Sequence, residues 1–129
     1  MTTTTLDVFR NEKDIRTFEA GAVIFREGDP GKEMFAVLDG NVDIKKGNVV
    51  LATLGPGSIF GEMALIDDSP RSADAVAKTA CRLAAVDNRR FLRLVAYNPQ
   101  IALQLLSILS ERLRQADAEV VAHEEHHDG

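Results

Sequence analysis

Short apolar runs interrupted by glycine constrain the fold of this chain more than any other feature of its sequence. Up to residue 60 these runs recur about every ten residues, and glycine bounds most of them. The runs cover residues 15–18, 23–25, 34–38, 42–44 and 49–54. Short strands with turns at such regular intervals are typical of an antiparallel barrel or jelly roll. We therefore expect a mainly β fold.

Two further runs, 72–77 and 81–86, predict two more strands that are rich in alanine. Small side chains leave the interior of a barrel either narrow or with room for a ligand, and both alternatives remain open. The second run begins with Cys81, the only cysteine, which excludes an internal disulfide. We expect Cys81 to be a small buried hydrophobe, and the chain to be cytoplasmic.

The pattern changes from strands to helices at Asp87, a good N-cap for a helix whose apolar positions begin at Phe91. Asn98 and Pro99 have the order of an N-cap and a first helical residue, which predicts a second helix to about residue 122. Its apolar stripe consists of Leu105 or Leu106, Leu109, Leu113, Ala116 and Val120. The stripe is longer than packing on a small barrel requires. The helix therefore pairs with a second copy, folds down as a lid, or simply packs on the core.

The 129 residues are expected to form one domain over 1–122, with strands in about 13–86 and helices in about 88–122. A polar tail, 123–129, contains all three histidines. Their order is not the zinc-protease motif and no apolar neighbour fixes their geometry, so we expect a solvated end and not a metal site.

Charge and hydropathy exclude two classes of function. The net charge of −5 argues against non-specific nucleic-acid binding, which depends on neutralising phosphates. No apolar run approaches the roughly 18 residues that a membrane-spanning helix needs. Any attraction of this chain for an anion must therefore be local.

The stretch from Phe60 to Ala73 is a candidate for such local attraction. Gly61 ends a strand and is followed by one turn of good helix formers, whose first N–H groups suit an anion. Arg71 offers a planar fork that matches phosphate oxygens. Glu62 suits a hydroxyl, since a carboxylate accepts hydrogen bonds. Phosphate plus hydroxyl indicates a nucleotide, although the same residues fit an ordinary surface turn with a solvated arginine.

No arrangement typical of catalysis is present. The barrel region contains no histidine, so the histidine ligands of metal-dependent barrel enzymes are missing. Ser58, Ser72 and Thr79 have no histidine base near them in the sequence. We therefore expect a binding protein and not an enzyme, with neither a metal nor a cofactor.

These residues resemble the cyclic nucleotide-binding domain family, which includes the catabolite activator protein, the regulatory subunits of cyclic-AMP-dependent protein kinase and gated channels. The segment Phe60–Leu65, five intervening residues and then Arg71–Ala73 look like the phosphate-binding cassette of that family. A looser similarity covers Gly28–Gly40, where Ala36 stands at a position that is usually bulkier. The resemblance spans about residues 6–120 and implies a β-roll with a short phosphate-binding helix and two C-terminal helices.

The resemblance also implies a role for each matching residue. Glu62 would accept a hydrogen bond from the ribose 2′-hydroxyl, and Arg71 would pair with the phosphate. The ligand-binding residues would be Gly61, Glu62, Met63, Ala64, Arg71 and Ser72, with backbone N–H groups contributed around Met63 and Ala64. Serine at position 72 favours cyclic AMP over cyclic GMP. The candidates for covering the base are Leu109, Arg112 and Leu113.

The expected function is a cyclic nucleotide sensor that binds cyclic AMP. Binding would move the hinge at 87–91 and the final helix, and the signal would pass to a separate protein partner or through a homodimer. We expect no attached effector, because too few residues follow the final helix for a DNA-reading helix-turn-helix. The alternatives are a structural or interaction module of the same fold with little nucleotide binding, or a sensor of cyclic GMP.

Overall fold

Two four-stranded antiparallel sheets form the body of the computed structural model, which describes residues 5–67 and 69–127 but not the side chains of Thr5, Arg112 and 115–127. The first sheet has the order β1 (Ile15–Phe18), β8 (Cys81–Asp87), β3 (Glu33–Asp39), β6 (Ile59–Phe60). The second has the order β2 (Val23–Phe25), β7 (Asp74–Ala77), β4 (Val42–Lys46), β5 (Val49–Leu54). Most neighbours are distant in sequence, as in a β-roll, so the predicted fold class is confirmed.

Strand β3 lies at the centre of the first sheet and is buried on both faces. Met34, Ala36 and Leu38 belong to one core cluster, whereas Phe35 and Val37 belong to the other. The alternation follows the two-residue period of a strand. The first cluster lies against the helices and the second fills the barrel between the sheets. Alanines in β8 pair with Phe35 and Ala36 across the ladder, which explains the alanine-rich run without an enlarged interior at this point.

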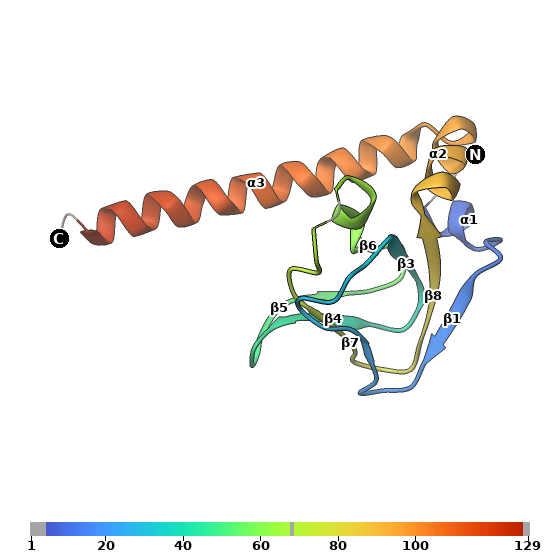
Figure 1. Cartoon of the computed structure of the whole chain (residues 1–129), viewed down its shortest axis with the longest axis horizontal. Helices are drawn as coiled ribbons and strands as arrows, with labels where there is room; N and C mark the ends of the chain where they lie inside the picture. The colour runs from blue at the N-terminus through green and yellow to red at the C-terminus, as the bar shows by residue number, and fades with distance from the viewer. Residues whose placement is uncertain (1–4, 68, 128–129) are drawn as a thin grey trace.

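The helices gather at one end of the barrel, where α1 (Thr5–Phe9), α2 (Asn88–Tyr97) and the start of α3 (Gln100–His127) meet (Figure 1). Asp87 caps α2 as predicted, since its carboxylate accepts a 2.9 Å hydrogen bond from the N–H of Arg90. The Asn98 side chain instead donates to the carbonyl of Leu94, so it serves the end of α2 and not the start of α3.

Helix α3 passes over the short 3₁₀ helix η1 (Glu62–Leu65) and then extends beyond the strands (Figure 1). It continues to His127, further than the predicted end near residue 122. The extension has a physical reason, because residues 121–127 contain neither glycine nor proline and include alanine and glutamate, which favour helices. The histidine side chains of the tail lie outside the described residues. In the part of the chain that the structure describes, no helix is long and apolar enough to cross a membrane.

Candidate functional site

The turn from β6 into η1 depends on a glycine. Gly61 has a φ of 73°, in the left-handed region that a side chain disfavours. A Cβ at this position would also stand 2.8 Å from Nη1 of Arg71. The chain therefore enters η1 at a position where only glycine fits both the turn and the neighbouring guanidinium.

Arg71 is positioned by the turn that follows β2. Its N–H donates to the carbonyl of Asp29 (2.9 Å), and its own carbonyl accepts from the N–H of Gly28 (2.8 Å). The side chain then turns inward, where Nη1 donates to the carbonyl of Gly61 (3.1 Å) and Nη2 to the carbonyl of Glu33 (2.8 Å). Only 8% of Arg71 is exposed. The guanidinium is thus held by the backbone of two separate segments.

One donor of this buried guanidinium has no acceptor. Nε of Arg71 is buried and has no hydrogen-bond partner among the residues that the structure describes, and such atoms are uncommon because each costs about 1–3 kcal/mol. Burial lowers the pKa of Arg71, and the negative charges of Glu33, Asp29 and Glu62 oppose that shift. Arginine remains charged at neutral pH even so. The site therefore holds a desolvated cation with a spare donor, which suits an anion.

Glu62 is completely buried next to this cation. It has no exposed surface, and its negative charge opposes the lowering of the Arg71 pKa that burial causes. Its side chain does not form part of the wall of either cavity described below. The structure therefore brings Glu62 to the site but sets it behind the surface that a ligand would meet first.

A cavity of about 140 Å³ opens in front of Arg71. Its wall consists of Phe25, Ile44, Phe60, Gly61, Met63, Ala64, Ser69, Pro70, Arg71, Ser72 and Ala73. Five of the predicted ligand-binding residues, Gly61, Met63, Ala64, Arg71 and Ser72, meet in this wall. The N–H of Ala64 makes a long 3.3 Å contact with the carbonyl of Gly61. We call this cavity, with Glu62 behind it, the phosphate end.

A second cavity, of about 630 Å³, lies between the sheet of β4 and β5 and helix α3. It shares Ile44, Phe60, Ser72 and Ala73 with the phosphate end, so the two cavities are adjacent. Its volume is in the range of small-molecule sites. Leu51 and Leu54 contribute an apolar wall. We call it the base end.

Helix α3 contributes Gln104, Ile108 and Glu111 to the wall of the base end. Nε2 of Gln104 donates to the carbonyl of Gly57 (3.2 Å), which ties the helix to the barrel. Of the predicted covering residues, Leu109 is half-buried and Leu113 is 65% exposed, and neither is part of this wall. The side chain of Arg112 lies outside the described residues.

Sequence reasoning missed Gln104, Ile108 and Phe25. A signal existed for the first two, because positions 104 and 108 lie three and seven residues after the apolar Ile101 and so share its helix face. Phe25 follows no local motif, because its partner Arg71 is far along the sequence.

Comparison with known proteins gives consistent matches. The family model described as the cyclic nucleotide-binding domain matches residues 15–98. The cyclic AMP receptor protein of Thermus thermophilus is 38% identical over 110 residues, which are 81% of this chain and 51% of the relative. A cyclic nucleotide-gated potassium channel of Mesorhizobium japonicum is 47% identical over 87 residues, which are 67% of this chain and 24% of the relative. The chain therefore spans about half the length of the first relative and about a quarter of the second.

A solved structure agrees in fold as well as in sequence. The catabolite activator protein of Thermus thermophilus superposes with a TM-score of 0.75 and 36% identity. The match covers 90% of this chain and 55% of that chain. A match over 90% of the chain is longer than the segment 15–98 that the family model covers, so it includes part of the C-terminal helices as well as the strands.

Proposed function

This chain belongs to the cyclic nucleotide-binding domain family, and on that premise we propose that it is a sensor of cyclic AMP. Arg71 pairs with the cyclic phosphate, and the C-terminal helices pass the change to a separate partner. One observation carries the proposal: a buried arginine in a cavity wall has an Nε–H without an acceptor. A phosphate oxygen supplies that acceptor and neutralises a charge that burial has stripped of water.

The phosphate end supports contacts to the phosphate and the ribose. The hydroxyl of Ser72 and the backbone around Met63 and Ala64 line the same wall as Arg71 and donate to the remaining phosphate oxygens. Glu62 accepts a hydrogen bond from the ribose 2′-hydroxyl. Because Glu62 is completely buried, binding requires a local shift of η1 that brings its carboxylate to the ligand.

The base end supports a purine. It is large enough for a base, is adjacent to the phosphate end and has apolar walls from β5. Gln104 from α3 adds a polar group that is able to meet a base edge. Serine at position 72 and the cyclic AMP receptor named above both favour cyclic AMP over cyclic GMP as the ligand.

Contacts between η1 and α2 support a route for the signal. Nδ2 of Asn88, the first residue of α2, donates to the carbonyl of Leu65 (2.7 Å), the last residue of η1. A shift of η1 on binding would therefore move the start of α2 through this hydrogen bond. Coupling of about 1–3 kcal/mol through such a contact is ordinary for a ligand-controlled switch.

The exposed faces of α2 and α3 support a partner protein or a second copy of this chain as the receiver. These faces carry Leu92, Tyr97, Leu103, Leu106 and Leu113, each at least 60% exposed. Exposed aromatic and leucine side chains in a row are typical of interaction surfaces.

Calorimetric titration with cyclic AMP, cyclic GMP and linear 5′-AMP tests the proposal. We expect saturable one-to-one binding of cyclic AMP, weaker binding of cyclic GMP, weakest binding of 5′-AMP, and recovery of the ligand intact. Tighter binding of cyclic GMP would reassign the ligand. If neither cyclic nucleotide produces heat or a shift in melting temperature, the chain is a structural module of this fold. Hydrolysed ligand would contradict a purely binding role.

A further inference from the structure

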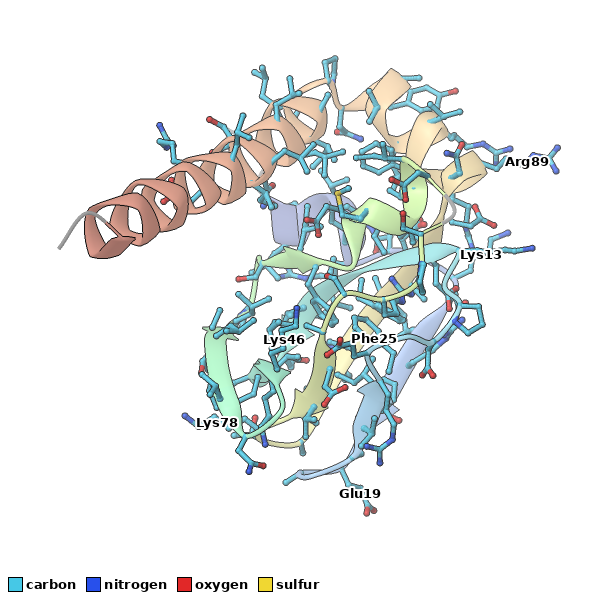
Figure 2. All side chains as sticks on the ribbon, turned by 60° about the vertical axis from the view of Figure 1, so that its left-hand side comes forward. Lys13, Glu19, Phe25, Lys46, Lys78 and Arg89 are labelled. Atoms are coloured by element: carbon cyan, nitrogen blue, oxygen red, sulfur yellow. The ribbon has the colours of Figure 1, made fainter. Side chains whose placement is uncertain are left out.

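Phe25 lies against the guanidinium of Arg71. The Cζ atom of Arg71 is 4.2 Å from the centroid of the Phe25 ring, compared with 5.8 Å for Phe35. Both Phe25 and Arg71 are part of the wall of the phosphate end. Figure 2 shows Phe25 in the middle of the molecule, whereas Glu19 and Arg89 project from its edge.

The hydrogen bonds of Arg71 leave the faces of its guanidinium without a partner. All donors of a guanidinium point outward in its plane, so its two carbonyl contacts fix positions in that plane only. A ring below the plane attracts the cation through its quadrupole and limits tilting of the plane. Phe25 supplies that contact without competing for a donor.

Phe25 is itself held firmly. Its ring lies 6.1 Å from that of Phe35 and 6.0 Å from that of Phe60, and the latter two rings are 5.4 Å apart. The three rings come from β2, β3 and β6, so both sheets contribute to the cluster. Such aromatic pairs are favourable beyond the area that they bury, so the cluster fixes the position of the Phe25 ring relative to both sheets and beside Arg71.

Gly31 leaves the space that the guanidinium occupies. A Cβ at Gly31 would stand 2.2 Å from Nε, 2.3 Å from Cζ and 2.6 Å from Nη2 of Arg71. The guanidinium therefore occupies a slot with the backbone of Gly31 at one wall and the Phe25 ring at 4.2 Å. Nε, the atom without an acceptor, is inside this slot.

We propose that Phe25 is a positioning residue for the phosphate: its ring holds the guanidinium of Arg71 in the plane from which Nε and the free N–H groups meet the ligand. This inference rests on the proposed function, because it assigns to Phe25 an effect on the affinity of the same site for cyclic AMP. Phe25 needs no contact with the ligand to act. It sets the affinity through the orientation of the arginine.

Phe25→Leu removes the ring while keeping an apolar side chain. Phe25→Tyr keeps an aromatic ring and should therefore keep the affinity for cyclic AMP. We expect Phe25→Leu to weaken binding of cyclic AMP by about 3- to 30-fold, the range of cation–π contacts from exposed to desolvated sites, and Phe25→Tyr to stay within about twofold of the parent protein. Phe25→Met serves as a second variant if the leucine variant does not fold. Phe18→Leu is the matched control, because Phe18 is also half-buried against the same core cluster but has no ring contact with Arg71 among those described.

A ligand-independent readout separates this inference from the proposed function. The ring current of Phe25 should shift the side-chain proton resonances of Arg71 upfield in the parent protein and in Phe25→Tyr, but not in Phe25→Leu. If the parent protein binds no cyclic nucleotide but shows this shift, the proposed function fails, whereas the contact between the Phe25 ring and the Arg71 guanidinium is confirmed. If the parent binds and a folded Phe25→Leu binds equally well, or if Phe18→Leu loses as much affinity, the inference is overturned.

Discussion

The phosphate end and the base end of the cavity are built in different ways. At the phosphate end, backbone carbonyls, two glycines and a ring fix one cation in a wall around about 140 Å³. At the base end, side chains of β4, β5, the 57–60 segment and α3 surround about 630 Å³. Under the proposed function, we therefore expect affinity to be set at the first end and choice of ligand at the second.

The two ends also differ in what holds them. The phosphate end is attached to both sheets through β2, β3 and β6, whereas α3 is held to the barrel by apolar packing of Ile101 and Ile108 and by the bond from Gln104 to Gly57. Substitutions at the phosphate end should therefore change affinity for every ligand that carries the cyclic phosphate. Substitutions at the base end should change only the ranking of bases.

Removing the cation should have the largest effect. Arg71→Ala strips the partner from a buried phosphate, which costs about 3–5 kcal/mol, so binding should weaken at least about a hundredfold. The melting temperature should change little, because the variant also removes a desolvated charge. Calorimetry measures the affinity. Arg82→Ala, which breaks one exposed ion pair with Asp39, is the control and should bind normally. Normal affinity in Arg71→Ala would remove the distinction between the two ends.

Glu62→Gln should have the next largest effect, on ribose recognition. A hydrogen bond to a charged acceptor contributes about 1.5–3 kcal/mol, so the parent protein should prefer cyclic AMP over its 2′-deoxy analogue by more than about tenfold. The amide should reduce that preference to a few-fold. Competition between the two ligands measures it. An unchanged preference would mean that the buried carboxylate never reaches the ribose.

Gly31→Ala should have a smaller effect that is confined to the phosphate end. The added Cβ forces the guanidinium out of its slot, and an off-rotamer side chain costs about 0.5–1.5 kcal/mol, so affinity should fall by about 2- to 10-fold. The melting temperature should fall only slightly, because the displaced group is the end of a flexible side chain but gives up its hydrogen bonds to the carbonyls of Gly61 and Glu33. Gly55→Ala is the matched control for Gly31→Ala, because a Cβ at Gly55 would meet only the Asn41 side chain, at 3.2 Å. Equal losses in both variants would show a general response to lost glycine.

Ile108→Ala should have an effect no larger than that of Gly31→Ala, and at the base end alone. Partial loss of one apolar side chain from the wall costs about 1 kcal/mol, so cyclic AMP should bind about fivefold more weakly. Ribose cyclic phosphate without a base should bind the variant and the parent equally. Leu103→Ala, on an exposed face of α3, should change neither value. A loss of affinity for the base-free ligand would mean that the two ends are not separable.

The same difference decides what the sequence could predict. Gly61, Met63, Ala64, Arg71 and Ser72 lie within one short stretch, so local motif reasoning placed them together, and the cavity wall contains all five. Most of the strands were predictable because glycine bounds most of the apolar runs up to residue 60. The order of strands in the two sheets was not, since it depends on pairings between distant segments.

The residues that were missed depend on contacts across the fold. Phe25 meets Arg71 only after β2 and the β6–β7 segment come together, and no spacing in the sequence encodes that contact. On α3, the apolar stripe pointed to Leu109 and Leu113, but the helix turns Gln104 and Ile108 toward the barrel. The facing side of a helix depends on how it leaves α2, and that angle is a property of packing.

The central claim is that the buried Nε–H of Arg71 lacks an acceptor in the free protein and donates to a cyclic phosphate when the ligand binds. The ¹⁵N–¹H resonance of its Nε, followed by NMR during titration with cyclic AMP, tests this claim most directly. We predict that the resonance moves downfield and that its exchange with water slows in step with saturation, because the buried N–H gains a phosphate acceptor. Saturated binding with the Nε resonance unchanged would contradict the account.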